Sequence, residues 1–435
     1  MGLLIGVGTT RPKFAYDYYY GIQWDSTTSN PAVTRVGKSE LHASLPVQSM
    51  MRRCVVNDAG NVVYYLDAND STKTSTGATA DLSGATGNVM VEIPAHYYRF
   101  EKDGTTCRAF ISTYPLPGFT RRGTQYVSAY EAALDRTNNK LMSIVNADAQ
   151  FRGGNNTAAW DDTYRSLLGR PATNISLTNF RTYARQGRNT DWNCNTYDVH
   201  KTLFWMFAIE YATRNSQATF NAALDANGYH QGGLGAGVTT ISDWGGYNGN
   251  NPFVPCGVTN SLGNKTGVVT YNALASDGET TYYAAPVPSY RGVENPFGHI
   301  WKWTDGVLCN IHSEGDGGTS DFLVCDDPAN YSSSITDNYT KRGELPRTDG
   351  YVKTIMLGDD GDIMPTAIGG GSSTYYCDYF YTNIPSSGSA TRGVRFGGSA
   401  TNSTSAGFVY ADTGSAPASA TATLGSRLCY IPQSA

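Results

Sequence analysis

The stretch ENPFGHIWKWTDG, from Glu294 to Gly306, is the most distinctive part of this chain. Trp301 and Trp303 alternate with Ile300 and Lys302, so a strand at this place would direct both indoles to the same face. Paired large aromatic side chains usually anchor a core. The residues NPFG just before them favour a tight turn into the strand. We therefore expect Trp301 and Trp303 to be scaffold residues.

The composition indicates a loop-rich folded protein. Of 435 residues only 16% are charged, whereas glycine occurs 48 times and tyrosine 30 times. Disordered chains have few aromatic residues and many charges. The net charge of -5 gives no basis for binding nucleic acid, which requires clustered lysine and arginine. The longest apolar run, residues 203–209, is too short to enter and cross a bilayer. We expect neither nucleic-acid partners nor membrane insertion.

The order of the patterns predicts an α+β fold with two helices, mixed or antiparallel sheets and long loops. Residues 51–67 and 89–113 each alternate like a pair of strands around a turn. Ser176 is a helix cap before LTNFRTYARQ, and residues 197–214 form an apolar helix expected in the core. Residues 1–47 are polar and turn-rich, and we expect a short N-terminal attachment or connecting segment there. Residues 48–435 then form one ligand-binding domain.

Signals for catalysis and for metal binding are weak. The chain has no HExxH, GxSxG or Walker motif, and its six histidines and eight cysteines are scattered without ligand spacing. GDDGD, residues 358–362, bunches three aspartates as calcium sites do, but it lacks the full twelve-residue calcium loop. We expect a solvated turn there, and no cofactor and no metal, although a structural calcium ion is an alternative. We also expect that the protein is not an enzyme.

The stretch between Gly398 and Gly425 has an unusual composition between two firm flanks. Of its 26 residues, 21 are Ser, Thr, Ala, Gly, Asn or Asp. Such a composition alone is typical of a flexible linker. RGVRFGG precedes it and LGSRLCY follows it, and both flanks carry strand-like apolar residues with glycines. The flanks favour a segment that is held in place at both ends.

NPFGHIWKWTDG, RGVRFGGSA and LGSRLCY resemble, in this order, the three closing signatures of C-type lectin-fold proteins of the formylglycine-generating-enzyme type. Residues 89–104 resemble the opening strands of that family, and the two expected helices resemble its helices. The resemblance spans about 89–430 and implies a C-type lectin fold, in which the three signatures lie in one sheet. It adds Gly397, Gly398 and Arg427 to the scaffold residues. The enzymes of this superfamily carry two redox cysteines after the GGS sequence, and no cysteine occurs in 399–424. An oxidase is therefore only a distant alternative.

The chain resembles more closely the variable proteins of diversity-generating retroelements, which include tropism determinants at the tips of phage tail fibres. In that family adenine-directed mutagenesis rewrites this segment, and changes in AAY codons never yield Lys, Glu, Gln, Met or Trp. None of these five residues occurs in 399–424. The resemblance implies a variable region at about 399–424. Its implied ligand-binding positions are Thr401, Asn402, Ser403, Ser405, Tyr410, Asp412, Gly414, Ser415, Ser419, Thr421 and Thr423.

Tyrosines nearby are candidates for the same surface. Tyr376, Tyr379 and Tyr381 in TYYCDYFYT would flank the variable region, and packing in the core is the equal alternative. Small hydroxyl and amide side chains with rigid tyrosines are also typical of antibody paratopes.

The function implied by this resemblance is receptor binding in host recognition, at a phage tail-fibre tip and thus on the virion. The start of the chain has no recognisable secretion signal, which favours a phage particle assembled in a cytoplasm over an exported protein. A bacterial surface or pilus-tip adhesin is the alternative. The expected partner is a protein or a glycan on a bacterial cell surface. A homotrimer would add avidity to weak single sites.

Overall fold

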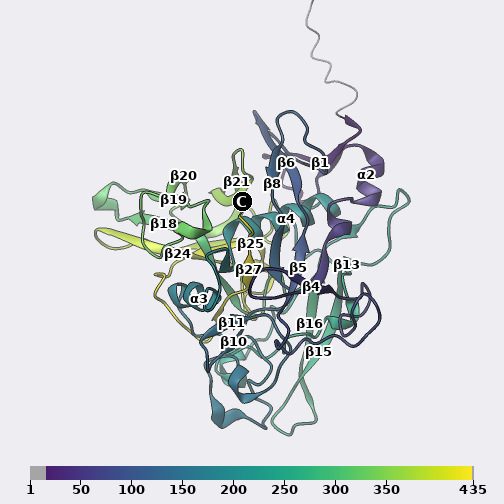
Figure 1. The fold of residues 1–435 in the computed structure, drawn as a ribbon. Coiled ribbons are helices and arrows are strands. Elements are labelled where there is room, and N and C mark those ends of the chain that lie inside the picture. Colours follow the sequence, from purple (N-terminus) through teal and green to yellow (C-terminus); the bar gives the residue numbers. More distant parts are fainter. Residues whose placement is uncertain (1–15, 434–435) are drawn as a thin grey trace, which may run out of the picture.

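The computed structural model describes residues 16–433, and this part of the chain is mostly β-structure with few helices (Figure 1). The strands form sheets of nine, six and five strands and three smaller sheets. The strand content is higher than the α+β expectation implied. No helix within 16–433 is long and apolar enough to cross a membrane.

Both expected helices form where the sequence places them. They are α3 (Leu177–Ala184) and α4 (Tyr197–Tyr211). The hydroxyls of Ser176 and Thr196 cap them by accepting a hydrogen bond from the amide three residues further on, at 3.2 and 3.3 Å. Almost every residue of α4 is buried, as expected for a core helix. There are two shorter helices, α2 (Ser39–Ser44) and α5 (Trp244–Asn248).

The nine-stranded sheet contains the strands that come directly before and after the variable region, β24 and β26. Its order is β20-β19-β18-β24-β25-β23-β21-β22, with β26 paired to β18. Neighbours are antiparallel except for the pairs β23–β25 and β18–β26, which are parallel. The strands are β18 (Trp301–His312), β19 (Ser320–Val324), β20 (Thr340–Glu344), β21 (Gly350–Leu357), β22 (Asp362–Ile368), β23 (Tyr379–Thr382), β24 (Ser389–Gly397), β25 (Gly407–Thr413) and β26 (Leu424–Gly425).

The expectation that the three closing signatures lie in one sheet is wrong in part, because they are divided between two sheets. β18 pairs with β24 and with β26, so the first two signatures and the start of the third share the nine-stranded sheet. The rest of the third signature, β27 (Leu428–Tyr430), belongs to the six-stranded sheet. That antiparallel sheet has the order β12-β27-β9-β5-β3-β4. Its other strands are β3 (Arg52–Val56), β4 (Val62–Tyr65), β5 (Asn88–Ile93), β9 (Gln125–Ser128) and β12 (Trp192–Cys194).

The five-stranded sheet corrects the expectation of a connecting segment at 1–47. Residues 1–15 of that segment lie outside the described residues. β1 (Tyr19–Asp25) pairs with β7 (Thr106–Ser112) along its whole length, and Tyr20, Ile22 and Trp24 are buried in the main core. The alternating apolar side chains of YYGIQWD account for this, because they bury one face of a strand. The sheet has the order β2-β1-β7-β6-β8, with β2 (Thr34–Gly37), β6 (His96–Asp103) and β8 (Thr120–Arg122).

Two hydrophobic cores hold the sheets and helices together. The main core surrounds α4 and receives side chains from all three large sheets. A second core contains Trp301, Trp303 and the buried side of α3, so the two tryptophans share one cluster as expected. Small sheets complete the fold: β10 (Ala133–Asp135) with β11 (Lys140–Met142), β13 (Phe220–Asn221) with β14 (Gln231–Gly232), and β15 (Gly267–Leu274) with β16 (Thr281–Tyr290) and β17 (Val293–Glu294).

Candidate ligand-binding site

The predicted variable region occupies both ends of one central strand. Residues 401–405, here called the first loop, lead into β25, and residues 414–423, the second loop, follow it. β25 has seven residues, and a strand of that length extends over about 23 Å. Nine of the eleven candidate residues therefore form two separate groups, and the other two, Tyr410 and Asp412, lie in the buried strand that joins them.

The backbone of the first loop is fixed by residues outside it. The amide of Ser403 donates to the carbonyl of Thr239 at 2.8 Å, and the side chain of Gln217 donates to the carbonyl of Ser403 at 2.9 Å. The side chains of Thr401 and Ser403 are exposed, whereas Ser405 is half-buried. The loop thus presents changeable side chains on a backbone that other segments hold.

Asn402 differs from its neighbours in the first loop. Its Oδ1 accepts hydrogen bonds from the backbone amide and from the hydroxyl of Ser399, both at 2.7 Å. This side chain closes the turn that begins the variable region. The structure therefore gives Asn402 a structural contact where the sequence predicted a ligand contact.

The second loop is fixed in the same way. Its carbonyl groups at Ser415, Pro417 and Thr421 accept hydrogen bonds from the amides of residues 393, 177 and 174, at 3.0, 3.0 and 2.9 Å. Thr421 is exposed, and Ser419 and Thr423 are half-buried. The hydroxyls of Thr421 and Thr423 lie 2.9 Å apart, so these two residues do share a side, although they belong to a turn and not to a strand.

A row of aromatic rings connects the first loop with β18. Tyr351 contacts Tyr379, Tyr379 contacts Tyr410, and Tyr410 contacts Trp301, with ring centroids 5.2, 5.9 and 4.7 Å apart and near-perpendicular planes. Edge-to-face contacts of this kind add to the stability that burial provides. The hydroxyl of Tyr351 lies 3.5 Å from the hydroxyl of Ser405. We call these four residues the aromatic row.

Arg395 and Asp412 form a buried ion pair beside the aromatic row. Nη2 of Arg395 donates to Oδ2 of Asp412 at 2.7 Å, and the guanidinium lies 5.0 Å from the centre of the Trp301 ring. The other oxygen of Asp412 accepts from the amide of Gly414 at 2.8 Å. The pair therefore connects β24, β25 and the start of the second loop.

Two of the predicted ligand-binding residues are not accessible. Tyr410 is 6% exposed and Asp412 is 5% exposed. β25 lies between β24 and β23 in the sheet, and all seven of its residues are buried, so both of its faces are covered as well as its edges. Burial raises the pKa of Tyr410 above its usual value, which keeps the hydroxyl neutral. The expectation that these two residues contact a ligand directly is wrong for the protein in this conformation.

For Tyr376 the alternative of packing in the core is the correct one. It is 1% exposed in the main core, where Arg214 lies 5.0 Å over its ring. Its neighbours Tyr375 and Cys377 have φ of 57° and 63°, a left-handed conformation that breaks the alternation of a strand. Tyr379 and Tyr381 follow in β23, where Tyr381 pairs with Asp412 and is 38% exposed. These two do flank the variable region.

The predicted scaffold residues have structural contacts. Trp303 is fully buried, and Gly397 and Gly398 have φ of 96° and 78°, where a side chain would be strained. A Cβ on Gly398 would also lie 2.8 Å from that of Ala406. Arg427 is 2% exposed and donates to the carbonyls of residues 128 and 295 at 3.0 and 2.7 Å.

Sequence reasoning missed the residues that hold the variable region from other parts of the chain. Tyr351, Gln217 and Thr239 are far from it in sequence, and no local pattern marks them. Arg395 was detectable, because it alternates with Val394 and Phe396 in RGVRFGG and so faces away from the main core.

The thiols show no sign of activation. All eight cysteines are buried and free. Burial raises the pKa of Cys377 and of Cys429, each to about 12. Reactive cysteines instead have a lowered pKa and some exposure. Within residues 16–433 no group of three His, Cys, Asp or Glu residues could hold a metal ion. Asp360 and Asp362 of the GDDGD turn instead pair with Arg342 and Lys201.

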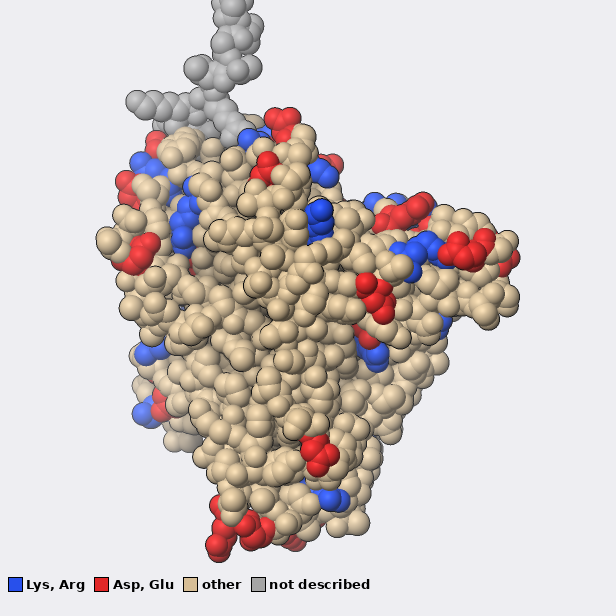
Figure 2. All heavy atoms as spheres, turned by 180° about the vertical axis from the view of Figure 1, so that it is seen from behind, with Lys and Arg blue, Asp and Glu red and all other residues tan. Residues whose placement is uncertain are grey.

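Charges are sparse on the surface. Figure 2 shows a broad area without acidic or basic side chains on the face seen from behind. Charged residues of both signs lie toward its edges and on the projecting arm, which contains β19 and β20 in Figure 1. This face therefore has no large field of one sign that would steer a charged partner.

No family model and no curated protein matches the chain. Among solved structures it is similar to the Major Tropism Determinant U1, P3c and M1 variants, each at 11% identity over 92% of this chain. The matches cover 89%, 90% and 88% of those chains, with TM-scores of 0.25, 0.24 and 0.22. A similarity at this level does not establish a common fold.

Proposed function

We propose that this protein binds a receptor and presents the exposed side chains of residues 399–424 as a changeable ligand-binding surface. The main observation behind the proposal is that hydrogen bonds from other parts of the chain fix the backbones of the two loops. Residues outside the region bind the loop backbones, so Thr401, Ser403, Ser419 and Thr421 can change without the loss of a main-chain contact. A backbone ordered before binding also reduces the entropy cost of binding.

The size of the surface suits a macromolecular receptor. The two loops are separated by the length of β25, about 23 Å. A protein partner typically covers about 800 Å² of each surface, and such an area spans both loops. Tyr381 at the edge of this surface adds a rigid aromatic side chain of the kind that dominates paratopes.

We further propose that the scaffold is of the C-type lectin type and that the protein is not an enzyme. The pairing of β18 with both β24 and β26 supports the scaffold, because the closing signatures of that family lie side by side. The buried cysteines and the raised pKa values of Cys377 and Cys429 argue against thiol chemistry of the oxidase kind. Display at a phage tail-fibre tip, as a homotrimer and against a bacterial surface receptor, completes the proposal and rests on the resemblance in sequence.

Sequencing of natural clones tests whether the exposed residues of 399–424 vary. The coding sequence for 399–424 should have a near-repeat beside a reverse-transcriptase gene. Clones should differ at Thr401, Ser403, Ser419 and Thr421 and agree at the buried positions. A uniform sequence among many clones would rule out the changeable surface.

Binding to cells tests the receptor. Labelled protein should bind intact cells of a susceptible bacterium, and Thr401→Tyr and Thr421→Tyr should alter this binding. Thr76→Tyr is the matched control, since Thr76 is equally exposed outside the region. If all three variants bind like the wild type, the surface is not the receptor site. Light scattering of the purified chain measures whether it is a trimer.

A further inference from the structure

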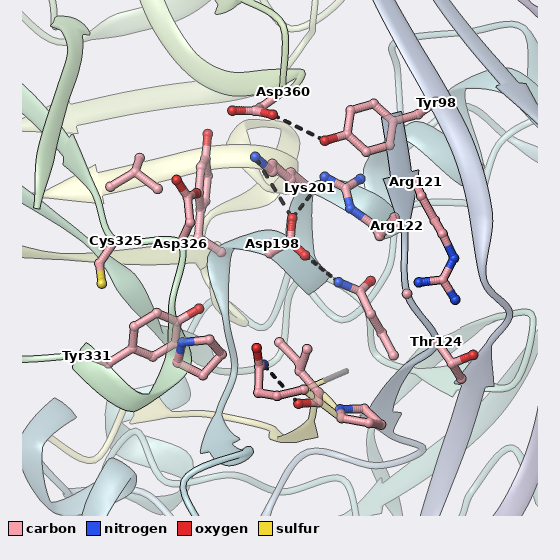
Figure 3. Close-up of a pocket in the computed structure, with 18 residues that line it drawn as sticks. Tyr98, Arg121, Arg122, Thr124, Asp198, Lys201, Cys325, Asp326, Tyr331 and Asp360 are labelled. Carbon is pink, nitrogen blue, oxygen red and sulfur yellow. Dashed lines mark hydrogen bonds and ion pairs between the residues drawn. The ribbon is translucent and has the colours of Figure 1, made fainter. Parts of the chain in front are cut away.

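A cleft of about 410 Å³ lies outside the variable region, and no residue of 399–424 lines it. Its walls come from β6, β8 and β9, the first turns of α4, the segment after β19 and residues 431–433 (Figure 3). Cavities of this size hold small organic ligands, and most of them combine a few fixed polar groups with apolar walls.

The charged groups of this cleft are held in fixed orientations. Asp198 pairs with Arg122 at 2.9 Å and also accepts from the side chain of Gln125. On the opposite side, Asp360 accepts from the hydroxyl of Tyr98 at 3.1 Å. Figure 3 shows Asp198 near the middle of the cleft and Asp360 with Tyr98 along one side. Carboxylates held in this way offer hydrogen-bond acceptors at little entropic cost.

Acids and bases balance within the cleft. The lining residues and their direct ion-pair partners comprise the bases Arg121, Arg122, Lys201 and Arg342 and the acids Asp198, Asp326, Asp360 and Asp362. A balanced set does not favour a strongly charged ligand, because every charge except that of Arg121 already has an opposite neighbour. It favours an uncharged ligand with many hydroxyl groups.

Two polar groups in the cleft lack partners within the described residues. Gln125 is 1% exposed, and its Oε1 has no hydrogen bond. Tyr331 is 7% exposed, and its hydroxyl has no partner among residues 16–433. Buried polar groups nearly always have a partner, so the buried Oε1 of Gln125 points to a ligand in the cleft. The Tyr331 ring and Pro328 also provide an apolar wall.

We propose that this cleft binds a saccharide. A sugar ring has hydroxyls at its edge, which donate to carboxylates and accept from arginine, and it has carbon–hydrogen faces, which pack on an aromatic ring. Asp198, Asp360 and Arg121 match the edge, and Tyr331 with Pro328 matches a face. The proposal is independent of the proposed function, since the cleft shares no residue with the variable region.

A glycan array that includes fragments of bacterial surface polysaccharides is the first test. The best binder is then titrated, with saturation-transfer NMR as the readout. Tyr331→Phe removes only the unpaired hydroxyl, and Arg121→Ala and Asp326→Asn change exposed residues at the cleft. We expect each variant to weaken binding up to about tenfold, as the loss of one hydrogen bond does.

Matched controls separate the cleft from other surfaces. Lys102→Ala and Asp103→Asn change exposed residues outside the cleft, and Thr401→Ala changes the first loop. All three should bind the saccharide like the wild type. The proposal is overturned if the array shows no binder, if sulfate or phosphate alone binds, or if the cleft variants bind normally with unchanged melting temperatures. It is also overturned if only Thr401→Ala loses binding.

Discussion

Tyr410 stands edge-on to Trp301, with ring centroids 4.7 Å apart and ring planes at 69°. A residue that the sequence placed among the changeable positions thus packs against one that it placed in the scaffold. Changeable positions and structural positions are therefore mixed along the sequence of 399–424. Burial separates them.

Replacement of Tyr410 by Ala should lower the free energy of unfolding by about 3–5 kcal/mol, because it empties a buried site between Trp301 and Tyr379. Thr401→Ala should change it by less than about 0.5 kcal/mol, because Thr401 is exposed. Denaturant titration of both variants measures the difference. Equal losses would contradict the distinction between the two positions.

Trp303→Ala should also cost about 3–5 kcal/mol of unfolding free energy, since the indole is fully buried beside Gly393. The absence of a side chain at Gly393 makes room for the ring, so Gly393→Ala should destabilise the protein as well. A Cβ at this position would lie 2.8 Å from the indole. Thermal unfolding compares these variants with Gly123→Ala, where a Cβ meets open space.

Asn402→Ala should loosen the turn that begins at Ser399, at a cost of about 1 kcal/mol, because two hydrogen bonds lose their acceptor. Asn402→Asp keeps an oxygen in the same place and should behave like the wild type. Hydrogen exchange of the Ser399 amide is the measurement. Faster exchange in both variants, or in neither, would show that the side-chain oxygen does not hold the turn.

A double-mutant cycle on Arg395 and Asp412 should give a coupling free energy of about 1–3 kcal/mol, because the pair is largely buried. Asp412→Ala alone should be strongly destabilising, since it leaves the guanidinium without its partner. Denaturant unfolding of the two single variants and the double variant supplies the cycle. Additive effects would show that the ion pair contributes nothing of its own.

The stability of the protein should fall as the pH decreases from 6.5 through 4. Burial lowers the pKa of His200 to about 4, so below pH 6.5 the unfolded chain binds a proton that the folded protein does not. Burial also lowers the pKa of His42 and His96 to about 4. Each shift corresponds to at most about 3 kcal/mol.

His200→Gln should therefore make the unfolding free energy less dependent on pH between 6.5 and 4. His312→Gln is the control, because His312 is only half-buried. Unfolding at a series of pH values gives both slopes. An unchanged slope in His200→Gln would mean that this histidine is accessible to protons in the folded protein.

Local signals in the sequence were enough for the parts of the fold that depend on neighbours along the chain. Ser176 marks the start of α3 because a cap bonds only three residues away. The alternation around Trp301 and Trp303 likewise predicts one buried cluster. β1 was missed, because its partner β7 lies about 85 residues further on and burial of Tyr20 depends on that pairing.

The sequence predicts which segment contains the candidate site, but it does not predict which residues of that segment are exposed. The composition of 399–424 identifies the two loops, since both contain small polar residues. It cannot reveal that β25 lies between β24 and β23, and that arrangement buries Tyr410 and Asp412. Nor can it reveal that the backbone at Tyr375 and Cys377 leaves the strand conformation and turns Tyr376 into the core.

The position of the two loops at opposite ends of β25 has a consequence for how such a surface could be searched. Effects of substitutions more than about 10 Å apart with no common partner are usually additive. A useful change in the first loop would keep its value whatever residue occupies the second. Improvements found separately could then be combined by recombination, and a small number of mutants would explore a large number of surfaces.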